Sequence, residues 1–291
     1  MRIKKINNIQ CHEIKTSGGF EFPRYKSTQE SSFIFGLIMG VKNSGKTNLV
    51  LTLLENEPHL LEKGNKVWFI SPTVDRKVEL FQEKYPDNFH VVDGLDLDTW
   101  RDTLELIKND VEEWKQFHSN LELLKKYLKK KKLEPEEIQQ LEECDYLQDV
   151  DFDKINMHYP NINTIIIDDS MGSPLISGTS NKAKEFQRFA IRHRHLMTNL
   201  FILTQYPRGI SKTLRANVNL MCVFPMRDHT IYKDAIFPEV SGLFDGSLQN
   251  FLDVMQLIEK RGDHSFLTMY YDKKQFVHIN WNEEVDFKET D

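Results

Sequence analysis

Short apolar runs alternate along the chain with segments in which apolar residues recur every three or four positions. The apolar runs cover residues 33–39, 66–70, 88–92, 164–168, 199–204 and 220–224. Near-continuous runs of this length are typical of strands buried on both faces, and the segments between them are typical of crossover helices. The pattern predicts an α/β fold with a mostly parallel central sheet flanked by helices.

Other segments depart from this alternation. From about 97 to 150, apolar positions between Trp100 and Leu128 keep a near-heptad spacing, and Pro135 lies where a second helix starts. We expect a helical hairpin inserted between core strands. Residues 265–271 and 275–279 flank a short polar turn and predict a C-terminal β-hairpin. The polar residues 1–30 predict an N-terminal arm or an edge strand.

Composition and charge restrict the class of protein. The 291 residues are 40% hydrophobic and 28% charged with a formal net charge of −6, which is typical of a soluble globular protein. Cys11, Cys144 and Cys222 lie far apart, as expected for reduced thiols. No secretory signal follows the basic start, and no apolar run reaches the length of a membrane span. We expect an intracellular, soluble protein.

The first apolar run leads directly into a glycine-rich loop. The loop reads Gly40-Val41-Lys42-Asn43-Ser44-Gly45-Lys46-Thr47-Asn48, and a helical segment follows. A strand, a glycine loop and a helix N-terminus form a polyphosphate cradle, because backbone N–H groups converge on the β-phosphate. Lys46 supplies charge to the β- and γ-phosphates, and the Thr47 hydroxyl is a Mg²⁺ ligand. The loop predicts a nucleotide-binding P-loop domain over 31–291.

Two later strand ends carry polar groups suited to hydrolysis. Asp168 ends the run at 164–168 and Asp169 follows it, at the carboxyl end of a buried strand. There Asp168 would hold Mg²⁺ beside Thr47, and Asp169 would orient or deprotonate the attacking water. Gln205 ends the next strand at the same edge and could sense the γ-phosphate. Asp and Gln are also common in ordinary strand-end turns, and that alternative stays open.

Positive charge is concentrated near that last strand. From Phe186 to Arg227 the chain has no Asp or Glu, yet it carries Arg188, Arg192, Arg194, Arg208, Lys212, Arg215 and Arg227. Such a basic block suits contacts to polyphosphate or to a nucleic-acid backbone, or an arginine that reaches a neighbouring subunit's nucleotide. Scattered solvated arginines are the plainer alternative. For the lysine run 129–132, a solvated helix end is the plainer alternative to a partner contact.

Five motifs are spread over roughly residues 30 to 230. They are, in order, Gly40-x4-Gly45-Lys46-Thr47, Phe69-Ile-Ser-Pro72, Ile166-Ile-Asp-Asp169, Arg194-His195 before Gln205, and Arg215-Ala216-Asn217 after it. Together these motifs resemble the genome-packaging ATPases of poxviruses and other large DNA viruses, which belong to the FtsK/HerA group of DNA-pumping ATPases. The helical insertion and the terminal hairpin lie outside this resemblance.

The resemblance implies a set of roles. Lys46 and Thr47 would bind ATP phosphate and Mg²⁺, Asp168 would be the metal acid, and Asp169 would be the acid that activates water. Many relatives carry Glu at the position of Asp169, and the shorter Asp must reach further. Lys42 is either a cation on the γ-phosphate or a solvated side chain.

The resemblance also implies a strand order and an arginine acting in trans. Gln205 would lie on a strand inserted between the P-loop strand and the metal-acid strand. Arg194 best matches an arginine that acts on the neighbouring subunit's nucleotide, and Arg215 is the second choice.

The expected function is an ATPase that assembles as a homo-oligomeric ring and moves double-stranded DNA into a viral capsid. Capsid or portal-vertex proteins are expected partners, in the host cytoplasm or the virion. Residues 172–180, which are flexible in composition, are a candidate DNA-contacting loop. The alternatives are a P-loop phosphotransferase acting on a small acceptor and a nucleotide switch or scaffold without hydrolysis. A GTPase is disfavoured, because Asn181-Lys-Ala-Lys184 lacks the acid of a guanine-binding motif.

Overall fold

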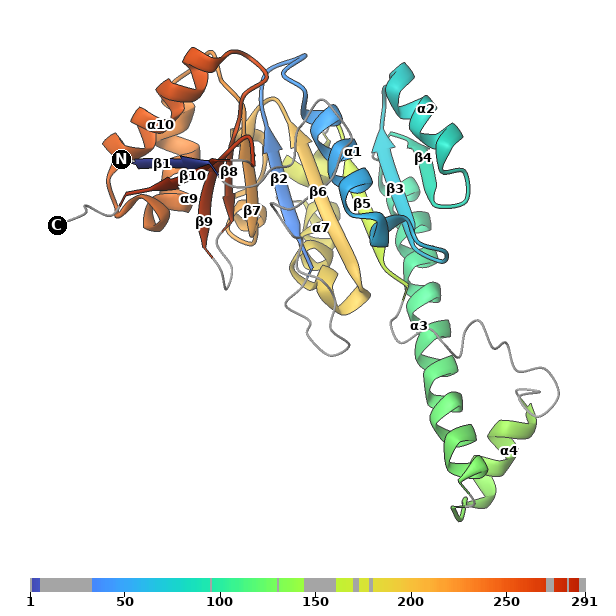
Figure 1. The fold of residues 1–291 in the computed structure, drawn as a ribbon. Helices are drawn as coiled ribbons and strands as arrows, with labels where there is room; N and C mark the ends of the chain where they lie inside the picture. Colours follow the sequence, from blue (N-terminus) through green and yellow to red (C-terminus); the bar gives the residue numbers. More distant parts are fainter. Residues whose placement is uncertain are drawn as a thin grey trace.

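A ten-stranded mixed sheet runs through the molecule in the order β1-β10-β9-β8-β7-β2-β6-β5-β3-β4 (Figure 1). The computed structural model describes residues 2–5, 33–94, 96–129, 131–143, 161–169, 173–177, 180–270, 275–281 and 283–287. None of its helices in these ranges is long and apolar enough to cross a membrane.

Six of the strands are parallel and form the half of the sheet that the apolar runs predicted. They are β7 (Leu220–Val223), β2 (Phe35–Met39), β6 (Thr198–Thr204), β5 (Asn163–Ile167), β3 (Lys66–Ser71) and β4 (Phe89–Asp93). β6 lies between β2 and β5, so the strand order expected from the resemblance is confirmed. The buried runs pair side by side because both faces of the sheet are covered.

The other strands extend the sheet in antiparallel fashion beyond β7. They are β8 (Leu267–Tyr270), β9 (Phe276–Ile279), β10 (Glu283–Asp286) and β1 (Arg2–Lys5). β8 and β9 pair as the predicted C-terminal hairpin. β1 is an edge strand on β10, which is one of the two predictions for the N-terminus; residues 6–32 lie outside the described residues.

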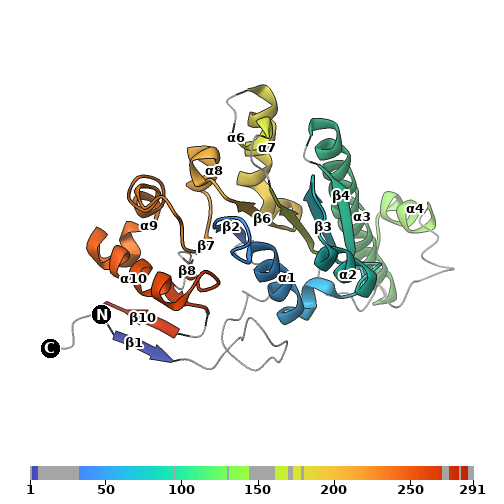
Figure 2. The same cartoon turned by 90° about the horizontal axis from the view of Figure 1, so that it is seen from above.

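Helices cover both faces of the sheet, as the view from above shows (Figure 2). One core cluster joins the sheet to α1 (Lys46–Asn56) and α2 (Arg76–Lys84). A second cluster on the other face takes in α3 (Leu97–Leu128), α6 (Pro174–Ser177), α7 (Asn181–Arg192), α8 (Lys212–Arg215), α9 (Phe237–Val240) and α10 (Leu248–Arg261). The fold is an α/β/α sandwich.

Shorter helical turns connect these elements. They are the 3₁₀ turns η2 (Pro58–Leu61), η3 (His193–Leu196), η4 (Pro207–Gly209) and η6 (Ser241–Phe244), and the π-helix η5 (Tyr232–Ile236). Cys222 is a buried thiol on β7, while Cys11 and Cys144 lie outside the described residues.

The predicted helical hairpin is present and projects from the body of the molecule (Figure 1). α3 is 32 residues long, and α4 (Pro135–Glu143) begins at the proline that marked the second helix. Leu123, Leu124, Leu133 and Leu141 form a separate small core at its far end. Residues 144–150, the predicted end of the insertion, lie outside the described residues.

The expectation of a flexible loop at 172–180 is wrong for its central part. Residues 174–177 form one helical turn, in which Leu175 and Ile176 are buried in the core. The apolar pair inside a Ser/Gly-rich stretch packs against the sheet, and this packing overrides the loop composition. Residues 172, 178 and 179 lie outside the described residues.

Candidate nucleotide-binding and hydrolysis site

The phosphate-binding loop joins β2 to α1 at the carboxyl edge of the parallel strands. Its first N–H, from Gly40, donates to the Thr204 carbonyl of β6 at 3.1 Å. A Cβ at Gly40 would lie 2.5 Å from Ser44 Oγ and 2.7 Å from Phe224 Cβ, so only glycine fits. Gly45 has a φ of 106°, a conformation that glycine adopts without steric strain. The loop therefore has the backbone that its sequence pattern requires.

The N-terminus of α1 is open to an anion. At Gly45 the helix has no side-chain cap and no acidic residue in its first turn. Five other helices, α2, α3, α7, α8 and α10, begin with a side chain that accepts from their first N–H groups; these caps are Asp75, Asp96, Ser180, Ser211 and Ser247. Uncapped N–H groups at the positive end of a helix dipole attract phosphate.

Lys46 holds a buried positive charge at the rim of this loop. The residue is 8% exposed, and its Nζ donates to the carbonyls of Gly40 at 3.0 Å and Val41 at 2.9 Å. Burial lowers the pKa of Lys46, and the charges of Asp168 and Asp169 oppose that shift. Carbonyl dipoles compensate a buried ammonium only in part, so anionic phosphate oxygens would stabilise it further.

Thr47 and Asp168 lie in direct contact. The Thr47 hydroxyl donates to Asp168 Oδ2 at 2.6 Å, across 121 positions of sequence. Burial raises the pKa of the Asp168 carboxyl, while hydrogen bonds from Thr47 and the Asp169 N–H and the charge of Lys46 act against the shift. A hydroxyl and a carboxylate side by side are oxygen ligands of the type that Mg²⁺ takes, with waters and phosphate as its other ligands. These two residues fit the metal implied by the resemblance.

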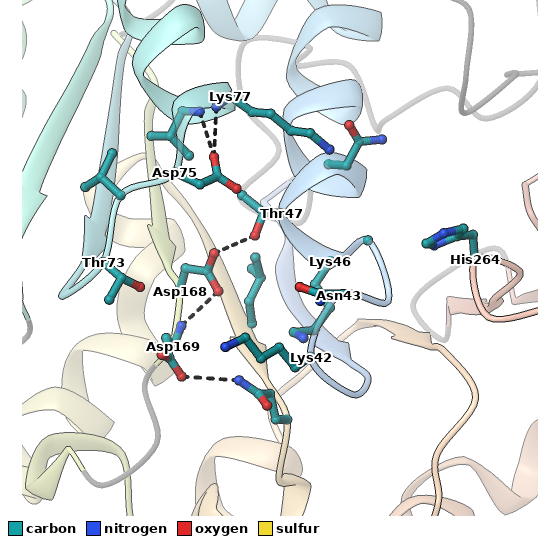
Figure 3. A pocket seen from close by; sticks show the side chains of 16 residues that line it. Lys42, Asn43, Lys46, Thr47, Thr73, Asp75, Lys77, Asp168, Asp169 and His264 are labelled. Carbon is teal, nitrogen blue, oxygen red and sulfur yellow. Dashed lines mark hydrogen bonds between the residues drawn. The ribbon is translucent and has the colours of Figure 1, made fainter.

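Asp169 is turned into the same site by its backbone. Its φ of 50° lies in the left-handed region, which Asp tolerates better than most residues. Its N–H donates to Asp168 Oδ1 at 2.8 Å, and its own Oδ1 lies 3.5 Å from Gln205 Nε2. β5 ends at Ile167, so strand alternation no longer separates the two acids, and both face the cleft (Figure 3). Gln205 comes from the adjacent β6.

These groups line one cleft of about 640 Å³, a size that suits a nucleotide. Its lining residues are Lys42, Asn43, Gly45, Lys46, Thr47, Asn48, Thr73, Val74, Asp75, Lys77, Val78, Asp168, Asp169, Leu203, Gln205 and His264. Lys42 is exposed and lines the cleft, which is compatible with a cation on the γ-phosphate and with a solvated side chain. The cleft thus brings the P-loop together with Asp168, Asp169 and Gln205.

Sequence reasoning missed two parts of this lining. The β3–α2 loop contributes Thr73, Val74 and Asp75, and a signal existed there: Asp75 directly before a helical segment is a typical N-cap. His264 comes from the loop between α10 and β8. No local pattern identifies His264, because its contact to Ser44 joins residues 220 positions apart.

The two arginines proposed to act in trans have different environments in the structure. Arg194 is exposed in η3, before β6 begins, and therefore lies at the opposite end of that strand from Gln205. Arg215 is engaged within its own subunit: its guanidinium donates to the carbonyls of Pro207 and Ile210 and lies 3.5 Å from Glu239. Both sit outside the cleft of their own chain.

Some residues of the basic block, between Phe186 and Arg227, form ion pairs within the subunit and others do not. Arg208 pairs with Asp234 at 2.8 Å and Arg215 pairs with Glu239, two acids that follow the acid-free stretch. Arg188, Arg192, Arg194, Lys212 and Arg227 are exposed. None of these five forms an ion pair with any described residue. The charge concentration seen in the sequence survives mainly around α7 and η3.

Comparisons with known proteins give similarity of fold at low identity. No family model and no curated protein matches the chain. Similar solved structures include the genome packaging NTPase B204 from Sulfolobus turreted icosahedral virus 2 in complex with AMP, at 12% identity and a TM-score of 0.47, covering 87% of this chain and 98% of that one. The same NTPase with ATP-gammaS is 12% identical, with a TM-score of 0.43, over 85% of this chain and 96% of that one.

EssC (ATPases 2 and 3) from Geobacillus thermodenitrificans is 15% identical, with a TM-score of 0.40, over 70% of this chain and 33% of that one. The similar structures thus include a viral genome packaging NTPase. At this level of similarity, activity and partners are assigned from the chain's own residues.

Proposed function

We propose that the protein hydrolyses ATP and uses the energy to move double-stranded DNA into a viral capsid. The observation that supports hydrolysis is that a P-loop lysine, a Thr–Asp pair, a second acid and a strand-end glutamine converge in one cleft. A nucleotide-binding protein that only switches would need the loop and the metal pair, but not Asp169 and Gln205 beyond them.

The contacts support the following roles. Lys46 exchanges its two carbonyl partners for phosphate oxygens. Thr47 and Asp168 hold Mg²⁺, which when bound offsets negative charge on the phosphates. Asp169, beside Gln205, orients the attacking water and accepts its proton, and Gln205 responds to the γ-phosphate. Each of these functions needs a side chain at this edge of the sheet.

The DNA part of the proposal rests on the motif resemblance and on charge. Sequence-independent transport requires contacts to the phosphate backbone rather than to bases. A chain of net charge −6 that keeps exposed arginines around α7 and η3 meets that requirement locally. Capsid or portal-vertex proteins as further partners, and the host cytoplasm or virion as the place of action, follow from the same proposal.

A ring of identical subunits is part of the proposal, with Arg194 acting in trans. β6 has seven residues and therefore spans roughly 20 Å, so Arg194 cannot reach the cleft at the other end of its own strand. An exposed arginine at that edge that pairs with none of the described acids suits a neighbouring subunit's nucleotide. The internal contacts of Arg215 make it the weaker candidate.

The test is displacement of a third DNA strand. The full-length protein, ATP and Mg²⁺ are added to a linear duplex carrying a triplex-forming oligonucleotide, and release of the oligonucleotide is measured. We expect release by the wild type and by Lys260→Ala, an exposed control position, and none by Lys46→Ala. ATP hydrolysis without release would contradict translocation. Phosphate transfer to a nucleoside or sugar, with no effect of DNA, would favour the phosphotransferase.

A further inference from the structure

A histidine from the antiparallel half of the sheet reaches the phosphate-binding loop. His264 Nδ1 lies 3.1 Å from the Ser44 carbonyl oxygen, and His264 lines the cleft. In Figure 3 the imidazole approaches the loop from the side opposite Asp168 and Asp169. Neither the P-loop pattern nor the acidic pair accounts for a side chain at this position.

The loop that carries His264 is held rigidly against the P-loop. Ser265 N–H donates to the Gly262 carbonyl at 3.0 Å, which closes a tight turn, and Phe266 N–H donates to Asn280 Oδ1 at 2.9 Å. The Phe266 ring lies 5.1 Å from that of Phe224, whose side chain would contact a Cβ at Gly40. His264 is therefore fixed relative to the site where phosphate would bind.

The two ends of the cleft have different chemistry. Asp168, Asp169 and Gln205 mark the γ-phosphate end, since they are the groups suited to metal binding and water activation. The P-loop lies between that end and His264. A nucleotide whose γ-phosphate faces the acids and whose β-phosphate occupies the loop must direct its nucleoside away from the acids, toward the end where His264 lies.

The hydrogen-bond chemistry of His264 suits that role. A carbonyl oxygen only accepts, so the contact to Ser44 requires the proton on Nδ1. In the neutral ring, Nε2 is then an acceptor that can receive a hydrogen bond from a ribose hydroxyl or a base amino group. The ring face is also available to stack on a base.

We propose that His264 forms the nucleoside subsite of the cleft and contacts the sugar or base of the bound nucleoside triphosphate. The proposal rests on nucleotide binding by the P-loop, which is part of the proposed function. It makes the α10–β8 loop, outside the P-loop core, a determinant of affinity for the nucleoside and not for the phosphates.

The test compares two ligands that share the phosphates and differ in the nucleoside. Dissociation constants for ATP and for inorganic tripolyphosphate, each with Mg²⁺, are measured by calorimetry for the wild type, His264→Ala, His264→Asn and Asp263→Ala. We expect both His264 variants to bind ATP about tenfold more weakly, as for the loss of one good contact, and to bind tripolyphosphate as the wild type does. Asp263→Ala, an exposed neighbour in the same loop, should match the wild type for both ligands.

His264→Asn separates nucleoside contact from support of the loop. An Asn amide can still donate to the Ser44 carbonyl but lacks Nε2 and the ring. If His264 only braces the P-loop, His264→Asn binds both ligands normally and His264→Ala weakens both equally, which overturns the proposal. Unchanged ATP binding in both variants also overturns it. If the wild type binds neither tripolyphosphate nor ATP, the proposed nucleotide function itself fails. That result differs from both outcomes that overturn the role of His264.

Discussion

At the scale of single residues, the site is defined by charges that burial leaves incompletely compensated. Lys46 has a lowered pKa and Asp168 a raised one, in both cases chiefly because burial disfavours the charged form. A ligand that brings phosphate to the lysine and a cation to the carboxylate relieves both penalties at once. Such perturbed pairs in a cleft are typical of functional sites.

Substitution of Asp168 and substitution of Asp169 are expected to have different effects on nucleotide binding and hydrolysis. Asp168→Asn should weaken Mg²⁺-dependent nucleotide binding, because the amide lacks the charge that a hard cation needs. Asp169→Asn should bind Mg²⁺-ATP normally but hydrolyse it at least about 100-fold more slowly, because a general base is lost. Calorimetry and single-turnover hydrolysis measure the two effects. Normal hydrolysis by Asp169→Asn would remove the role given to this acid.

At the scale of elements, most of the fold was predictable because its signals are local. The six parallel strands follow the apolar runs, and Pro135 marks the start of α4. The pairing of β1 with β10 joins the two ends of the chain, and no local pattern encodes it. The same distinction applies to the site. The P-loop and strand-end residues were predictable from local patterns. His264 and the acids paired with Arg208 and Arg215 were not, because their contacts form only after folding.

The two ends of α3 are expected to differ in their effect on stability. Trp100 is fully buried, with ring centroids 4.9 Å from Phe186 and 4.7 Å from Phe189, so it ties α3 to α7. Trp100→Ala should lower the free energy of unfolding by about 3–5 kcal/mol. Leu124→Ala, in the separate core of the hairpin, should leave global unfolding nearly unchanged. Urea denaturation followed by circular dichroism distinguishes them, and equal losses would contradict two independent cores.

At the scale of the whole molecule, two buried histidines link stability to pH. Burial lowers the pKa of His193 and of His278 from 6.5 to about 4. Between these values the unfolded chain binds protons that the folded protein does not, so stability is complete above pH 6.5 and is lost as pH falls toward 4. Each histidine contributes up to about 1.4 kcal/mol per pH unit in this window.

The variant His278→Phe checks this dependence. His278 Nδ1 is buried and has no hydrogen-bond partner among the described residues, so an aromatic ring of similar size leaves none of their polar groups unsatisfied. Denaturation at several pH values from 4 to 7 should show a shallower slope for the variant than for the wild type. An identical slope would mean that His278 titrates normally in the folded protein.

Assembly into a ring predicts complementation between inactive variants. Lys46→Ala lacks a working cleft but keeps Arg194, and Arg194→Ala keeps the cleft. If Arg194 acts in trans, mixed rings should recover part of the hydrolysis rate that each variant lacks alone. Lys260→Ala, an exposed position outside the basic block, should be close to wild type. Absence of recovery in mixtures that form rings would count against the trans assignment.

ATP hydrolysis in this cleft is proposed to serve an action on DNA. The most direct test is the steady-state rate of ATP hydrolysis by the full-length protein with Mg²⁺, measured with and without double-stranded DNA of unrelated sequences. We predict that DNA of any sequence accelerates hydrolysis by the wild type. In either condition Lys46→Ala should show no turnover and Asp169→Asn should turn over at least about 100-fold more slowly than the wild type. A wild-type rate that does not respond to DNA, or full turnover by Asp169→Asn, would contradict the account.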